Sequence, residues 1–362
     1  MNKLLRLLVV MVAGLTAFTL TAIGAAPAQA KPASASISVY LADGVTPAGS
    51  TVLHPGDQVV VKGTGFDPNA NTSGLPVPVP PGVPHGTFIT FGAFAPKWKP
   101  STGAPESART TVRAQTKWAL SRAALNKVPN VPFDMRRTVR QQWVPLSRSG
   151  SFTARITLAT PAKKPADGRW GIYTFGAADA VNAAQETMVP LRYSPEPGPN
   201  TPKPAPKNLV WAYSPNFART VVKSTSGALG GNGGAAVDDA GRMSFELVEN
   251  TVRDGRGELR YRGTVVASTK FHLLEIALAD PVIRVAGTRA VLSMRTSTTD
   301  MNGDDAMRRV DIADLTLTRG QVAKLARGEN IRGVSATFRR GITPTSLAAL
   351  SIGKASPVAI RF

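Results

Sequence analysis

The side chains that build most catalytic and metal sites are scarce in this sequence. There are three histidines, His54, His85 and His272, spread along the chain, and there is no cysteine. A zinc site needs three or four such ligands close together, so we predict no metal site. The sequence also lacks the G-x-S-x-G elbow that exposes a nucleophilic serine. We therefore predict no catalytic residues and a protein that is not an enzyme.

Acidic residues occur in short groups, at Asp238-Asp239, at Asp254 and over residues 300–305. The last group lacks the D-x-[DN]-x-[DN]-G spacing and the closing glutamate of a calcium loop. Its Asn302-Gly303 pair is typical of a hairpin turn. An acid pair for glycoside hydrolysis stays open as an alternative, because the fold rather than the spacing brings such pairs together.

A glycine-rich run occupies residues 227–234. No Gly-Lys-Ser or Gly-Lys-Thr follows it, so it is not a phosphate-binding loop. We expect a flexible loop there.

The first 30 residues have the pattern of a secretory signal. Lys3 and Arg6 precede an apolar run over residues 7–23, and Ala28-Gln29-Ala30 supplies the small residues that signal peptidase accepts. We expect cleavage after Ala30 and a mature protein that is secreted or held at the cell envelope, with no transmembrane segment. An uncleaved anchor is the alternative.

Elements that alternate apolar and polar residues indicate a mainly β protein in two parts. A proline-rich linker at 195–207, with six prolines, separates residues 31–194 from 208–362. In the first part we expect strands at 37–41, 58–62, 85–94, 152–159, 170–175 and 187–193, forming a sandwich. In the second we expect strands at 209–213, 220–223, 243–248, 258–266, 273–279, 282–285, 290–294, 310–317 and 357–362. Short helices are expected at 318–327 and 345–350.

A basic insertion, residues 97–148, interrupts the first part. Its only acids are Glu106 and Asp134. Its cations are Lys97, Lys99, Arg109, Arg113, Lys117, Arg122, Lys127, Arg136, Arg137, Arg140 and Arg148. The alanine-rich stretch 108–128 predicts a helix with Trp118, Arg122 and Leu125 on one stripe. The insertion's tryptophans either pack it onto the sandwich or build an anion-binding face with the cations.

The second part resembles the HtaA domain, the β-rich module of secreted and surface haem-uptake proteins of actinobacteria. The likeness lies in residues 209–217 (LVWAYSPNF), 261–265 (YRGTV), 274–281 (LEIALADP) and 357–362. The first part resembles the immunoglobulin-like domain of relatives through 61–66 (VKGTGF), 91–98 (FGAFAPKW), 170–174 (WGIYT) and 186–190 (ETMVP). The resemblance implies an immunoglobulin-like sandwich followed by an antiparallel HtaA-like β-domain.

The resemblance also implies haem as cofactor, held by a tyrosine and supported by a histidine. Those two positions are Thr220 and Lys270 here, and neither replaces a phenolate–imidazole pair. If residues 270–272 form a strand, His272 shares a face with Lys270, and Tyr213 and Tyr261 are the nearest phenols in the sequence. These three are the candidate haem contacts.

The net charge of +20 favours anionic partners. We expect an exported, envelope-associated binding protein whose partner is haem or a haem-carrying protein. The alternative is a structural or adhesive protein that binds anionic envelope polymers through the basic insertion. Nucleic acid is not an expected partner of an exported chain.

Overall fold

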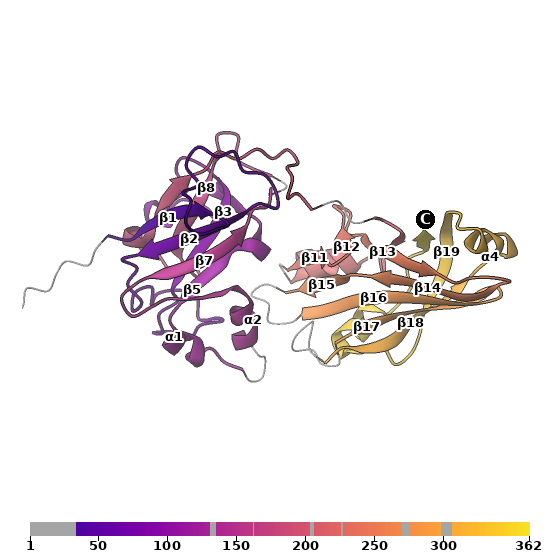
Figure 1. Ribbon diagram of the computed structural model, residues 1–362. Coiled ribbons are helices and arrows are strands. Elements are labelled where there is room, and N and C mark those ends of the chain that lie inside the picture. Colours follow the sequence, from indigo (N-terminus) through magenta and orange to yellow (C-terminus); the bar gives the residue numbers. More distant parts are fainter. Residues whose placement is uncertain are drawn as a thin grey trace, which may run out of the picture. The chain divides into compact units, whose positions relative to one another are not determined.

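The computed structural model describes residues 34–130, 135–161, 163–202, 206–225, 227–269, 275–297 and 306–362 (Figure 1). The predicted signal at 1–30 lies outside these residues, as do Lys270, His272 and the predicted turn at Asn302-Gly303. The protein is mainly β, as predicted. The strands fall into an N-terminal β-region, residues 34–202, and a C-terminal β-region, residues 206–362, each described separately.

The N-terminal β-region contains two sheets. One is antiparallel, in the order β1-β2-β7, and consists of β1 (Ser36–Leu41), β2 (Gln58–Thr64) and β7 (Phe152–Thr157). The other has the order β6-β5-β3-β8-β9, with β4 paired to β3. Its strands are β3 (Thr87–Phe94), β4 (Arg109–Thr111), β5 (Lys117–Leu120), β6 (Trp143–Pro145), β8 (Arg169–Gly176) and β9 (Met188–Pro190). The β5–β6 pair is parallel.

The two sheets share one core. Val59 and Val61 from β2 belong to the same buried cluster as Phe91 from β3 and Ile172 from β8. The alternation along β2 and β7 therefore turns one face of their sheet inward, onto the second sheet. This is the predicted sandwich; its kinship with immunoglobulin-like domains stays a prediction.

The predicted helix over 108–128 is wrong. Within this stretch, α-helix is limited to α1 (Arg122–Lys127), and Arg113–Gln115 forms a 3₁₀ turn. The next helix, α2 (Met135–Gln142), begins after the stretch has ended. Trp118 lies instead in β5, opposite Phe88, and its indole N–H donates to the carbonyl of His85 at 2.6 Å. Strand pairing and this hydrogen bond outweigh the helix propensity of the alanines.

The predicted linker starts against the N-terminal β-region. His54 Nδ1 lies 2.9 Å from the carbonyl oxygen of Glu196, and the Asn200 side chain donates to Asp57 Oδ1 at 2.9 Å. The Thr201 hydroxyl donates to the carbonyl of Pro55 at 2.7 Å. Residues 196–201 therefore pack against the β1–β2 connection rather than standing free.

The C-terminal β-region is built around a closed ring of eight antiparallel strands. The ring order is β16-β14-β13-β10-β20-β19-β18-β17, and β17 pairs back to β16. Its members are β10 (Leu209–Trp211), β13 (Met243–Asn250), β14 (Arg256–Arg262), β16 (Glu275–Ala286), β17 (Arg289–Thr296), β18 (Arg308–Thr316), β19 (Ile331–Phe338) and β20 (Val358–Ile360). One buried cluster fills the ring, including Trp211, Phe245 and Leu292.

Three strands attach to the ring from outside it. β15 (Thr264–Ser268) pairs with the first half of β16, while β14 pairs with the second half. Gly263, at φ +112°, makes the bend between β14 and β15. β11 (Ala228–Asn232) extends this side by pairing with β15, and β12 (Ala235–Val237) pairs with β13. Hence the predicted flexible loop at 227–234 is wrong: it is mostly strand β11, followed by a turn at Gly233 and Gly234.

A second correction concerns residues 220–223, which we predicted as a strand. They continue α3 (Phe217–Arg219) as a π-helical turn, Thr220–Ser224. Phe217 and Val221 are both buried in the core, whereas Arg219 between them is exposed, which fits a helix and not a strand, where all three would share a face. The predicted helices are confirmed as α4 (Arg319–Ala326) and α5 (Thr345–Leu350). No helix within the described ranges is long and apolar enough to cross a membrane.

Candidate functional site

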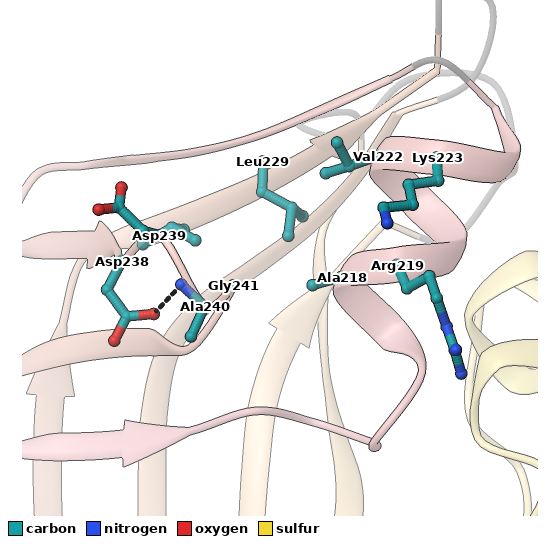
Figure 2. A pocket seen from close by; sticks show the side chains of 10 residues that line it. Ala218, Arg219, Val222, Lys223, Leu229, Asp238, Asp239, Ala240 and Gly241 are labelled. Atoms are coloured by element: carbon teal, nitrogen blue, oxygen red, sulfur yellow. Dashed lines mark hydrogen bonds between the residues drawn. The ribbon is translucent and has the colours of Figure 1, made fainter. Parts of the chain in front are cut away.

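A pocket of about 420 Å³ lies in the C-terminal β-region, between the helix over 217–224 and the turn that joins β12 to β13 (Figure 2). This volume falls within the range of small-molecule sites, roughly 300–1,000 Å³. We call it the helix pocket. Its lining residues are Ala218, Arg219, Val222, Lys223, Leu229, Val237, Asp238, Asp239, Ala240 and Gly241.

The helix side of the pocket follows from the burial of Phe217 and Val221. These two side chains face the core, so the residues after each of them, Ala218 and Val222, line the pocket. Val222 is 44% exposed, which is unusual for a large apolar side chain. Leu229 of β11 lies between this helix and the turn in Figure 2. The pocket therefore offers an apolar floor to a ligand.

The opposite side is a tight turn held by Asp238. Its carboxylate accepts hydrogen bonds from the backbone N–H of Arg242 at 2.9 Å and from Arg242 Nε at 2.7 Å. Partial burial acts to raise the pKa of Asp238, but these hydrogen bonds and the Arg242 charge outweigh it, so the pKa lies below its ordinary value. Gly241, at φ +73°, lets the turn approach the helix, because a Cβ here would come 2.1 Å from the Cβ of Ala218.

Charges of opposite sign stand on the two sides. Arg219 and Lys223 project from the helix, whereas Asp238 and Asp239 belong to the turn (Figure 2). Arg219 hydrogen-bonds to Asn216 and Lys223 has no ion-pair partner in the described part of the chain. An anionic group on an apolar ligand would therefore be attracted to the helix side.

Tyr213 lies in the core rather than in the helix pocket. It is fully buried among Trp211, Phe217 and Phe338, and its hydroxyl lies 2.6 Å from Ser351 Oγ. Burial raises the pKa of Tyr213 far above that of a free phenol. To contact a ligand in the pocket, the phenol would have to leave both its packing and its partner.

Tyr261 in β14 is also buried, with 3% of its surface exposed. Its hydroxyl has no hydrogen-bond partner among the described residues, and burial alone raises its pKa. Such an orphaned phenol has a spare oxygen, but Tyr261 is not among the residues that line the helix pocket. Its role as a haem contact stays a prediction.

Thr220, at the position that the resemblance assigns to the ligating tyrosine, is half-buried in the helix and does not line the pocket. The supporting position, Lys270, and the candidate His272 lie outside the described residues. The other two histidines belong to the N-terminal β-region. His54 contacts Glu196, and His85 is fully buried with Nδ1 and Nε2 at 2.9 and 2.8 Å from the carbonyl oxygens of Asn71 and Leu75.

The described lining of the helix pocket does not fit an iron-ligating site. It contains no tyrosine, histidine, methionine or cysteine. Over the described residues as a whole, no group of three histidine, cysteine or acidic side chains is placed to hold a metal ion. The lining of the pocket is therefore suited to contacts with the organic part of a ligand and not to bonds with a metal ion.

Residues 207–344 match the sequence profile of the HtaA family. This match confirms the predicted resemblance, and the matched segment is called the HtaA domain below. The match covers the helix pocket and most of the strand ring, but less than half of the whole chain. No curated protein matches the chain.

Three solved structures from Corynebacterium glutamicum are similar to part of this chain, at low sequence identity. The N-terminal domain of HtaA is 15% identical with a TM-score of 0.32, and the alignment covers 43% of this chain and 96% of that one. Its C-terminal domain is 13% identical with a TM-score of 0.30, covering 42% and 92%. The haem-binding protein HtaB is 12% identical with a TM-score of 0.29, covering 42% and 90%. Such values add no weight to the family match.

Sequence reasoning missed the residues that line the pocket. Arg219 and Lys223 are four residues apart, as are Phe217 and Val221. Together these pairs signal a helix with one buried and one charged side. The β-branched run Thr220-Val221-Val222 obscured that signal, because it favours a strand.

Proposed function

We propose that this protein is an exported, non-enzymatic binding protein whose HtaA domain holds an amphipathic, anionic tetrapyrrole such as haem in the helix pocket. The ligand is held by apolar contacts and by the cations of the helix, without an iron ligand at residue 220. The observation that carries the proposal is the apolar floor of Val222 and Leu229 beside Arg219 and Lys223, with no phenol in the described lining.

Three features support this function. The HtaA family implies haem as the ligand class, and the N-terminal pattern of residues 1–30 supports export. The pocket places two cations beside apolar side chains on its helix side, with Asp238 and Asp239 on the opposite side, so a ring system would direct its carboxylates toward the helix. The scarcity of catalytic side chains in the sequence supports a binding role rather than an enzymatic one.

The test compares haemin with metal-free protoporphyrin IX on the mature chain. Without an axial ligand, haemin and protoporphyrin IX should bind with dissociation constants within about threefold of each other, because the same contacts hold both. A bond from the protein to the iron would favour haemin by more than about 2 kcal/mol, which corresponds to about one and a half orders of magnitude in the dissociation constant. Haemin binding more than about tenfold tighter would contradict the proposal and direct attention to His272→Ala. No saturable binding of either compound would remove the function altogether.

The pocket is tested by the double variant Arg219→Ala and Lys223→Ala, which should raise the dissociation constants of both porphyrins by about tenfold. The matched control is Arg332→Ala with Lys354→Ala, which removes the same charge from exposed positions outside the pocket lining. Equal losses in the two double variants would mean that net charge rather than the pocket holds the ligand.

A further inference from the structure

The second half of the basic insertion, from β5 to the end of β6 and the residue Arg148, carries cations that the fold does not neutralise. Over residues 117–148 the sequence has one acid, Asp134. Its lysines and arginines are Lys117, Arg122, Lys127, Arg136, Arg137, Arg140 and Arg148. Apart from Arg137, which has a partner, none of these forms an ion pair in the described part of the chain.

A buried apolar cluster, called the floor below, packs beneath the helices that carry the cations. Val139 of α2 is 2% exposed and packs in one cluster with Trp118, Leu125 and Val128, and Met135 packs against that cluster. Because the helix buries the side that carries Met135 and Val139, Arg140 is directed to solvent. Trp118 and Trp98 are buried at 5% and 6% exposure, so these two tryptophans pack the insertion onto the sandwich.

Hydrogen bonds fix α1, α2 and β6 relative to one another. Arg136 donates from Nε to the carbonyl of Val128 at 3.0 Å and from Nη2 to that of Asn126 at 2.7 Å. The guanidinium of Arg122 lies 4.9 Å from the ring centroid of Trp143, whose indole N–H donates to the carbonyl of Leu120 at 2.8 Å. The side chains of Arg122 and Arg136 are therefore held in place before any partner binds, which lowers the entropy that their binding would cost.

From these contacts we infer that α1 and α2 form a docking surface for an anionic polysaccharide. The charges are spread over two helices about 9 and 12 Å long, so a small anion meets only one or two of them, whereas a chain with a charge on successive sugars meets several. The surface lies in the N-terminal β-region and does not involve the helix pocket.

The chemistry of the surface separates this partner from the two other common polyanions. An anionic membrane would need apolar side chains to insert, and every exposed large apolar residue of the described chain lies outside the insertion. Single-stranded nucleic acid would need free aromatic faces for its bases. Within the described insertion Trp98 and Trp118 are buried and Trp143 is covered by Arg122.

The experiment uses the mature chain and dextran sulfate of defined length, with uncharged dextran as the blank. The triple variant Arg122→Gln, Lys127→Gln and Arg140→Gln removes the exposed cations of α1 and α2 and should lose at least about thirtyfold in affinity, because each removed contact multiplies the dissociation constant. The control Arg155→Gln, Lys163→Gln and Lys164→Gln removes the same charge from another part of the same β-region and should lose less than about threefold. Circular dichroism verifies that both variants are folded.

Equal losses in the two triple variants would overturn the docking surface, since total charge would then explain the binding. Tighter binding of an oligonucleotide, or of phosphatidylglycerol vesicles, than of dextran sulfate at equal charge would overturn the assignment to polysaccharide. Because the porphyrin test substitutes residues of the other β-region, failure here leaves the proposed function intact, and failure there leaves this surface intact.

Discussion

The basic insertion and the outer wall of the strand ring are both rich in cations, but the wall pairs most of the cations named below with carboxylates, whereas the described insertion pairs few of its own. On the ring, Asp311 of β18 lies 2.6 Å from Arg284 of β16 and 3.3 Å from Arg339. Arg262 reaches Glu246 across the β13–β14 pair at 2.7 Å. In the insertion the ion pair formed among described residues is Arg113–Glu106, at 3.0 Å and well exposed.

The difference teaches what each set of charges is for. Arginines that alternate with carboxylates across neighbouring strands support the register of the sheet and leave little charge for a partner. Cations without carboxylates repel one another, so they add nothing to folding and remain available for an external anion. The comparison can be tested from the floor of the insertion outward to its surface.

The largest effect is expected at the floor. Trp118→Ala removes a buried indole and its hydrogen bond to His85, and should lower the free energy of unfolding by about 3–5 kcal/mol. Urea unfolding measures it, followed by the fluorescence of the four remaining tryptophans, Trp98, Trp143, Trp170 and Trp211. Trp143→Ala is the control, and because Trp143 is half-buried it should cost less than half as much. Equal costs would mean that the floor does not depend on Trp118.

Alkaline titration compares the aromatic cores of the two regions. Burial raises the pKa of Tyr173 to about 12, against the lowering effect of its hydrogen bond with Phe94 and of the Arg169 charge. Burial raises the pKa of Tyr213 and Tyr261 further still. A raised pKa stabilises the fold below the unfolded pKa, near 10, and this stability is lost as the pH rises toward the folded pKa.

Between pH 10 and 12 the folded protein should therefore show less tyrosinate absorbance than the same protein in urea, and its stability should fall across that window. Tyr261→Phe removes one late-ionising phenol without changing the shape of the core. Identical titration curves in the folded and unfolded states would contradict the burial of these phenols.

A smaller effect is expected on the wall of the ring. Asp311→Asn leaves Arg284 and Arg339 without this carboxylate, and should cost up to about 1 kcal/mol, since these groups are more than a third exposed and solvent screens them. A double-mutant cycle with Arg284→Gln isolates the pair. The coupling should shrink at about 1 M salt, and a coupling that ignores salt would show that packing rather than charge is responsible.

The smallest effect is expected on the surface of the insertion. Lys127→Gln with Arg140→Gln should change the free energy of unfolding by less than about 0.5 kcal/mol, because neither side chain has an ion-pair partner in the described structure. Thermal melts at low and high salt measure this change. A loss of more than about 1 kcal/mol in the free energy of unfolding would mean that these cations stabilise the fold as much as the ion pairs of the ring do.

Much of the fold could be predicted because regular alternation marks a strand with one buried face. Strands β1, β2 and β7 have this pattern. The start of α4 is marked in the sequence by the capping box of Thr318 and Gln321. β19 was missed since its register with β20 shifts between Ile331 and Val334, which breaks the period of two. The closure of the ring depends on the pairing of β10 with β20, which joins residues about 150 positions apart in the sequence, and no local pattern encodes such a pairing.

The candidate site was harder to predict for the same reason. Arg219 and Lys223 matter through the turn that faces them, and that turn depends on Gly241 meeting Ala218 across the pocket. The sequence does show a short polar turn at Asp238-Asp239, but not what lies opposite to it. Tyr213 and Tyr261 were singled out by residue type, whereas their burial is decided by packing against residues from distant strands.

The position of β11 outside the closed ring has a consequence for how the helix pocket opens. β11 is bonded to β15 on one edge and lies at the end of the strand order, so Leu229 can swing away while all eight ring strands keep their hydrogen bonds. Opening the pocket therefore costs only a few edge contacts, far less than global unfolding. Backbone amide hydrogens of β11 should exchange with deuterated water long before those of β16 and β17. A ligand bound in the helix pocket should slow the exchange of the β11 amides and leave that of β16 and β17 unchanged.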